Sequence, residues 1–133
     1  MGGPSGEYTA AVARRVPLTF DTVREMGLAL PDVEAGTTYG SPALKVRGRM
    51  FACMASHRSA EPGSLVVRLP MEDWEELLRA EPETYYIKEH YESYPVVLVR
   101  LARVHPDALR DLLQGAWRMV SDKRTRSRPR VRR

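Results

Sequence analysis

Cysteine is nearly absent from this sequence, with Cys53 the single one among 133 residues. That scarcity excludes an internal disulfide and any site in which two cysteines bind a metal. Because Cys53 lies among apolar residues, we expect a buried and unreactive thiol. A chain of this length buries roughly two-thirds of its unfolded surface. It can therefore fold around one hydrophobic core without a covalent or metal crosslink.

Long apolar runs are missing as well. No stretch approaches the roughly 18 apolar residues that span a membrane. Residues 1–8 lack the apolar core of a signal peptide. We therefore expect a soluble cytoplasmic protein that makes no membrane contact.

Acidic side chains are missing from the end of the chain. Residues 123–133 contain seven basic side chains, no acidic one and a single apolar one. The whole chain has a net charge of +4, but residues 1–122 contain 14 basic and 17 acidic side chains and therefore have a net charge of −3. Such a segment cannot bury enough surface to offset the entropy of ordering it. We predict a flexible segment at 1–17, one domain at 18–122 and a disordered basic tail at 123–133.

Hydrophobic periodicity predicts alternating groups of strands and helices. Apolar side chains at helical spacing indicate helices at about 20–29, from Pro70 to before Pro82, and from Pro106 to about 120. Alternating patterns indicate strands at 44–47, 50–54, 65–69, 84–88 and 96–104, with a short edge strand within 32–40 left open. The order predicts an α+β two-layer sandwich, α-β(3)-α-β(2)-α, with the helices on one face of an antiparallel sheet.

The segment from Tyr39 to Met54 predicts a tight β-hairpin with Gly48 at its turn. Side chains alternate between the two faces of a strand, so regular pairing assigns four apolar residues to one face of the hairpin. We expect this core face to consist of Leu44, Val46, Phe51 and Cys53.

Three stretches resemble the MmcQ/YjbR-like family. These are residues 39–52, Tyr-Gly-Ser-Pro-Ala-Leu-Lys-Val-Arg-Gly-Arg-Met-Phe-Ala, then Pro-Glu-Thr-Tyr-Tyr at 82–86 and the end of the final helix at 117–123. The resemblance covers about residues 18–124. It implies a two-layer α+β fold of the secretion-chaperone-like kind and a proposed DNA-binding role through wing-like β-hairpins. The chain departs from the family pattern at Tyr39, where tryptophan is common, and at 90–95, where a basic loop has become neutral to acidic.

Basic side chains on the hairpin and in the tail are the candidate nucleic-acid site. A basic hairpin can lie along a phosphate backbone, and a basic tail adds affinity without sequence specificity. The alternative for the hairpin is a solvated strand face whose charges discourage aggregation. The alternative for the tail is a segment that only increases solubility. The candidate residues are Lys45, Arg47, Arg49, Lys123, Arg124, Arg126, Arg128 and Arg130.

Catalysis finds little support in the sequence. The three histidines, at 57, 90 and 105, have no metal-ligand spacing, and no phosphate-binding loop or nucleophile motif is present. We expect no enzyme activity, no cofactor and no metal, and a monomer or weak dimer. The alternative function is a protein- or small-ligand-binding module without a nucleic-acid role. One group of aromatic side chains either lines a pocket, stacks on bases or belongs to the core: Tyr85, Tyr86, Tyr91, Tyr94, Trp74 and Trp117.

Overall fold

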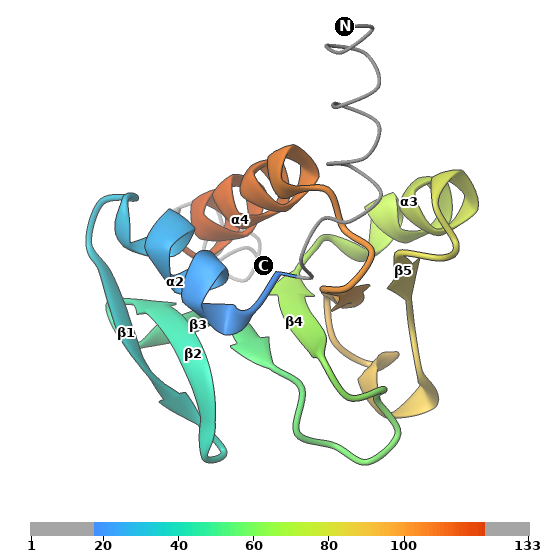
Figure 1. The fold of residues 1–133 in the computed structure, drawn as a ribbon, viewed down its shortest axis with the longest axis horizontal. Coiled ribbons are helices and arrows are strands. Elements are labelled where there is room, and N and C mark those ends of the chain that lie inside the picture. Colours follow the sequence, from blue (N-terminus) through green and yellow to red (C-terminus); the bar gives the residue numbers. More distant parts are fainter. Residues whose placement is uncertain (1–17, 122–133) are drawn as a thin grey trace, which may run out of the picture.

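The computed structural model describes residues 18–121, so the segments predicted to be flexible at 1–17 and disordered at 123–133 lie outside the described residues. Within that range, six strands form one antiparallel sheet in the order β1-β2-β3-β4-β6-β5 (Figure 1). The elements are α2 (Phe20–Leu28), β1 (Val33–Thr38), β2 (Ser41–Val46), β3 (Arg49–Met54), β4 (Ser64–Arg68), α3 (Trp74–Ala80), β5 (Tyr85–Tyr86), β6 (Val96–Arg100) and α4 (Pro106–Ser121). Short 3₁₀ turns, η1 (Met71–Asp73) and η2 (Glu89–Tyr91), precede α3 and β6.

The α+β architecture is confirmed. The strand predicted at 84–88 shortens to the two residues of β5, and two further differences concern the strands. The edge strand left open within 32–40 is β1, a full six residues long, which places four strands before α3. The last strand ends at Arg100 rather than at 104, because the amides of Arg103 and Val104 turn back onto the Arg100 carbonyl. Both differences leave the two layers as predicted.

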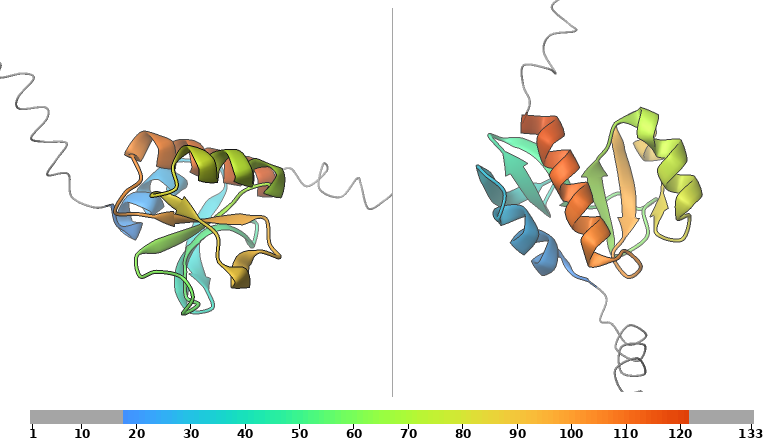
Figure 2. Two further views of the ribbon diagram at one scale, coloured as in Figure 1. Left: turned by 90° about the vertical axis from the view of Figure 1, so that its right-hand side faces the viewer. Right: turned by 90° about the horizontal axis from the view of Figure 1, so that it is seen from above.

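The three helices cover one face of the sheet, with α4 across its middle between α2 and α3 (Figure 2). The predicted stripe of α4 is buried at Leu109, Leu113, Ala116 and Val120. It packs on side chains of the central strands such as Leu65. Each large side chain in this layer contributes roughly 1.5–3 kcal/mol by burial. This helix-covered side holds the main core of the domain.

Two hairpin turns share one backbone conformation. Tyr39-Gly40 joins β1 to β2 with φ of 52° and 80°, and Arg47-Gly48 joins β2 to β3 with φ of 51° and 82°. Two consecutive residues with positive φ form the turn that matches the twist of antiparallel strands, and Asn-Gly is its preferred sequence. Tyrosine and arginine at the first position are therefore unusual occupants.

A β-bulge in β3 changes which residues share the core face of the hairpin. Leu44 lies opposite Ala52 while Lys45 lies opposite Met50, so Phe51 is an extra residue in the ladder. Phe51 packs in the helix-covered core as predicted. The prediction for Cys53 is wrong, because the extra residue reverses the alternation and Cys53 belongs to a cluster on the other face.

Candidate functional site

The face of the sheet opposite the helices carries a second, smaller apolar cluster. Its buried members are Ala43, Cys53, Val66, Tyr86, Tyr91, Val96 and Leu98. Two loops, 55–63 and 87–95, lie on this side of the sheet (Figure 2). They cover the face in part, and a cavity remains between them and the β1–β2 turn.

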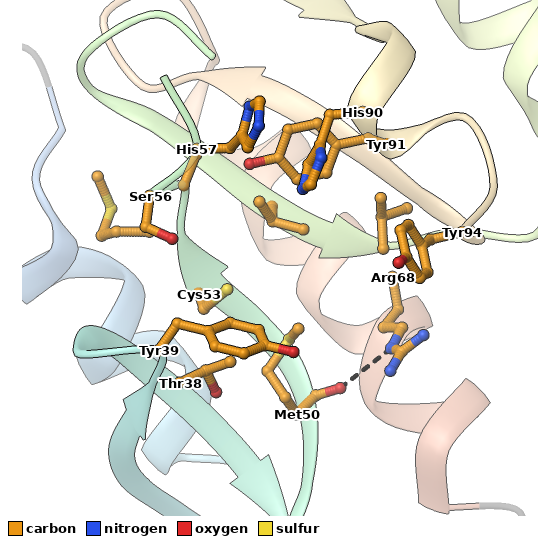
Figure 3. A pocket seen from close by; sticks show the side chains of 14 residues that line it. Thr38, Tyr39, Met50, Cys53, Ser56, His57, Arg68, His90, Tyr91 and Tyr94 are labelled. Atoms are coloured by element: carbon orange, nitrogen blue, oxygen red, sulfur yellow. Dashed lines mark hydrogen bonds between the residues drawn. The ribbon is translucent and has the colours of Figure 1, made fainter. Parts of the chain in front are cut away.

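That cavity, which we call the open-face pocket, has a volume of about 590 Å³. Its lining comes from segments far apart in the chain and, among residues 18–121, includes no aspartate or glutamate (Figure 3). The lining residues are Thr38, Tyr39, Met50, Cys53, Met54, Ala55, Ser56, His57, Val66, Arg68, His90, Tyr91, Tyr94 and Val96. Apolar side chains of the sheet form its floor, and aromatic and basic side chains stand around its mouth.

Two histidines from the two loops stack at one side of the pocket. The ring centres of His57 and His90 are 3.6 Å apart and the rings are nearly parallel, while the Tyr91 ring stands almost perpendicular to both. The Ser59 amide donates to Nδ1 of His57 over 3.1 Å, which requires an unprotonated nitrogen there. Partial burial and the neighbouring His90 lower the pKa of His57 below 6.5. The stack therefore consists of a neutral His57 held against its partner, and it joins the two loops.

Arg100 anchors the 55–63 loop at its far end. Its guanidinium forms two hydrogen bonds of 2.8 Å with the Glu61 carboxylate and lies 4.3 Å from the centre of the Tyr86 ring. The Tyr86 hydroxyl, in turn, pairs with the buried Ser64 hydroxyl and accepts from the Glu61 amide. These contacts hold the loop against the sheet, and with it one wall of the pocket.

Two tyrosines at the pocket mouth are unusually exposed. Tyr39 is 93% exposed and Tyr94 is 52% exposed. Among the described residues only two other large apolar side chains, Leu28 and Met71, are exposed to a comparable degree, at 44% and 41%. Neither of those lines the pocket. The exposed aromatic surface of the described domain is thus concentrated around one cavity.

Arg68 brings positive charge to this site. Its Nε donates to the Met50 carbonyl over 3.1 Å, which places the guanidinium at the mouth near Tyr94 (Figure 3). The charge acts on the pocket floor, where it opposes the rise in the pKa of Cys53. Burial is the larger effect and raises that pKa to about 11, so the thiol stays protonated at neutral pH. Cys53 is buried, as the sequence predicted.

The basic side chains of the β2–β3 hairpin do not gather on one surface. Lys45 lies opposite Met50 and Arg49 lies opposite Val46, so these two basic residues point to opposite faces. Arg47, at the turn, pairs with the Asp32 carboxylate at 3.2 Å. Lys45 also lies directly across from Glu34 of β1. The predicted tail residues, from Lys123 to Arg130, lie outside the described residues.

The aromatic group singled out from the sequence divides between pocket and core. Tyr91 and Tyr94 line the open-face pocket, whereas Tyr85 belongs to the helix-covered core and Trp117 donates to the Pro31 carbonyl. Sequence reasoning missed Tyr39, Arg68 and the histidine stack. The one available signal was Tyr39 itself, a large aromatic residue before Gly40 where a two-residue turn favours asparagine.

Neither a metal site nor a membrane span is evident in the described residues. No cluster of three or more histidine, cysteine, aspartate or glutamate side chains in residues 18–121 has the arrangement of a metal site. Nor is any helix of this part of the chain long and apolar enough to cross a membrane.

Comparison with known proteins supports the resemblance seen in the sequence. Uncharacterized proteins of Mycobacterium tuberculosis and Mycobacterium bovis are 40% identical over 47 residues, which is 35% of this chain and 36% of theirs. The match thus spans about a third of these curated relatives. A crystal structure of a Deinococcus radiodurans protein with a DUF419 domain is similar at a TM-score of 0.66 and 25% identity, over 80% of this chain and 81% of that one. The YjbR family model matches residues 28–119, and the chain belongs to the YjbR family.

Proposed function

We propose that this protein is a non-enzymatic binding module that takes a small, largely apolar ligand with an aromatic ring into the open-face pocket. The observation that carries the proposal is the pair of exposed tyrosines, Tyr39 and Tyr94, at the mouth of a cavity with an apolar floor. Ligand sites in proteins measure about 300–1,000 Å³ and combine apolar walls with a few polar groups. The volume of about 590 Å³ lies within that range.

The conformation of Tyr39 adds a second argument. Its φ of 52° lies in the left-handed region, which a bulky side chain rarely adopts. The exposed ring contributes almost nothing to the core, so stability of the fold does not account for it. Strained residues that persist without a structural benefit cluster at binding sites. Contact between a ligand and this ring would account for a strained residue that does not stabilise the fold.

The chemistry of the lining favours binding over catalysis. Cys53 is held as a thiol by the rise in its pKa, which removes the one strong nucleophile of the pocket. The Nδ1 atom of His57 accepts from the Ser59 amide and is not available as a base. The lining residues that the structure describes include no carboxylate, so the pocket offers mainly shape and aromatic surface.

Titration of the ¹⁵N-labelled protein with 2-naphthamide, a neutral planar probe, tests this function. We expect shifts of the amide signals around the pocket and saturable binding. Tyr39→Ala and Tyr94→Ala should each weaken binding roughly threefold to tenfold, the effect of losing one aromatic contact. Met71→Ala is the matched control, because Met71 is also an exposed apolar side chain but lies outside the pocket. Equal affinity in all four proteins would contradict the proposal.

Nonspecific nucleic-acid binding by the hairpin and the tail stays a second candidate, supported by the seven basic side chains of residues 123–133. The Asp32 and Glu34 carboxylates beside the hairpin weaken its positive field, so we expect the tail to dominate. Binding of a DNA duplex by the full chain, by a 1–122 truncation and by a Lys45→Ala, Arg47→Ala, Arg49→Ala variant separates the two contributions. Full binding by the truncation at about 50 mM salt, lost in the triple variant, would instead assign the affinity to the hairpin.

A further inference from the structure

The two loops on the open face of the sheet meet through histidines, the side chains whose charge changes most readily between about pH 5 and 8. We propose that the His57–His90 stack is a pH-sensitive latch: it holds the loops 55–63 and 87–95 together at neutral pH and releases them in mildly acidic solution. Release opens one wall of the open-face pocket. The latch belongs to the unliganded chain, so its test is independent of the binding function proposed above.

The stack is a contact between the two loops. His57 belongs to the first loop and His90 to η2 of the second, and their ring centres are 3.6 Å apart with an angle of 9° between the planes. The Tyr91 ring stands almost perpendicular to both, at 6.3 and 4.8 Å. Its hydroxyl points toward His57 (Figure 3). A change at either histidine therefore acts on the place where the loops meet.

The turn of the first loop requires an unprotonated His57. The Ser59 amide donates to Nδ1 of this ring over 3.1 Å, so the single proton of the neutral ring lies on Nε2. A second proton would occupy Nδ1 and point at the amide N–H. The Ser59 hydroxyl, 2.8 Å from the same nitrogen, can accept from a protonated ring, but the amide is then left without its acceptor. Protonation thus removes one of the contacts that shape this turn.

The stack also opposes a positive charge directly. When one ring becomes an imidazolium, any charge on the other lies across a face-to-face distance of 3.6 Å, where like charges repel strongly. Burial lowers the pKa of His57, and the positive charges of His90 and the neighbouring Arg58 lower it further. Arg58 is exposed and permanently charged. The closed arrangement of the loops therefore favours neutral rings.

Other ionisable groups near the stack do not remove this effect. Burial raises the pKa of the Tyr91 hydroxyl, which stays neutral where histidines titrate. Cys53 on the pocket floor, where the Arg68 charge acts, stays a neutral thiol. Three exposed charged side chains lie beside His90 in the second loop: Lys88, Glu89 and Glu92. None of these three is a cause of the lowered pKa of His57.

The far end of the first loop stays fixed over the same pH range. Arg100 forms two hydrogen bonds of 2.8 Å with Glu61, and this interaction lowers the pKa of the Glu61 carboxyl. The pair therefore stays ionised where histidines titrate. The Glu61 amide also donates to the Tyr86 hydroxyl, and the Ala55 amide bonds to the Ser64 carbonyl. Protonation of the stack therefore frees residues 56–60 and leaves the two ends of the loop attached to the sheet.

The direction of the pH effect follows from proton linkage. In the closed state the pKa of His57 is lowered, whereas a solvated ring in the open state has a pKa near 6.5, so opening takes up a proton. The stack stabilises the closed loops fully above pH 6.5, and this stabilisation is lost as pH falls from 6.5 through the closed-state pKa. Within that window the ratio of open to closed loops rises by up to about tenfold per pH unit.

Histidine ring NMR and amide hydrogen exchange of the full chain test the latch. The His57 ring should titrate below pH 6.5, and its pKa should rise toward 6.5 in His90→Gln, which removes the stacked ring. After correction for intrinsic exchange rates, protection of the Ser59 and Ala60 amides should fall by up to about tenfold per pH unit below 6.5. The Glu61 amide, bonded to Tyr86, is the internal reference and should keep its protection. Equal losses at all three amides would indicate general unfolding and overturn the latch.

Variants assign the response to the stacked pair. His57→Gln should keep the protection of Ala60 the same at about pH 7.5 and about pH 5.5, because glutamine does not titrate in this range. His105→Gln is the matched control and should keep the full response. The Nδ1 atom of His105 also accepts from an amide two residues ahead, that of Asp107 at 3.1 Å, but His105 precedes α4 on the other face of the sheet.

Two results would overturn the proposal in the unmodified protein alone, which keeps it testable should a variant fail to fold. One is a His57 ring that titrates at or above pH 6.5. The other is an Ala60 amide whose corrected protection is the same at about pH 7.5 and about pH 5.5. A response that disappears in His105→Gln as well as in His57→Gln would also contradict a latch at the stack. None of these measurements requires a ligand, so failure of the latch and failure of the binding function are separate results.

Discussion

A substitution at Tyr39 should stabilise the fold and impair the function at the same time. Tyr39 occupies the first position of a two-residue turn with a φ of 52°, and asparagine is the preferred residue there. Left-handed backbone costs about 1–3 kcal/mol at most side chains, and asparagine tolerates it better. Because the ring is 93% exposed, its removal opens no cavity in the core.

The expected gain for Tyr39→Asn is therefore about 0.5–1 kcal/mol in the free energy of unfolding. For a domain of this size that corresponds to a rise in melting temperature of about 2–4 °C. The same variant should bind 2-naphthamide roughly threefold to tenfold more weakly, since one aromatic wall is lost. Urea denaturation and calorimetric titration measure the two effects separately.

The second turn of the chain supplies the control. Arg47 has the same backbone conformation, before Gly48, but does not line the pocket. Arg47→Asn relieves the same strain and loses an exposed ion pair with Asp32, worth about 0–1 kcal/mol. We expect unchanged or slightly higher stability and unchanged affinity. Lower stability of Tyr39→Asn, or equal losses of affinity in both variants, would refute the reasoning.

Four further predictions concern the core and the pocket. Gly115→Ala should stabilise α4 by about 1 kcal/mol, since a Cβ there meets nothing within 4 Å. Gly27→Ala should destabilise the protein by up to about 2 kcal/mol, because its Cβ would clash with a methyl group of the buried Leu44. Melting temperatures that shift in the same direction for both glycine variants would contradict these two predictions. Iodoacetamide should alkylate Cys53 about a hundredfold more slowly at pH 8 than a thiol of pKa 9.0, given its pKa of about 11; a rate close to that of free cysteine would disprove the burial argument. Since the folded pKa of His57 lies below 6.5, the unfolded chain binds more protons just below that pH, and stability should fall as pH drops from 6.5 toward the folded pKa. Urea melts should show this loss reduced in His57→Gln and unchanged in His105→Gln.

Much of the helix layer is predictable from the sequence because burial there follows a simple period. The stripe of α4 repeats every three to four residues, and Pro106 marks its start. A turn at Gly48 follows from the length and composition of the hairpin, and the structure shows that Arg47 is the other turn residue. By contrast, β1 has a largely exposed surface, and its pairing with β2 rests on backbone hydrogen bonds. Backbone pairing leaves no hydrophobic pattern in the sequence.

The open-face pocket could not be predicted for two physical reasons. The bulge at Phe51 moves Cys53 to the pocket side, and no residue type marks a bulge of this kind. The stack of His57 on His90 joins two loops from different parts of the chain, so it exists only once the sheet has formed. Composition showed the aromatic residues, and the topology brought them together.

The sheet links the helices to the pocket mechanically. Lining residues come from the end of β1, from β3 and β4, and from β6, so the pocket reaches across most of the strand order. Neighbouring strands of a sheet are rotated by roughly 20–25° on average, and this twist sets the separation between Tyr39 at one side and Tyr94 at the other. Substitutions under α4 that alter the twist should therefore change the width of the pocket without touching any of its residues.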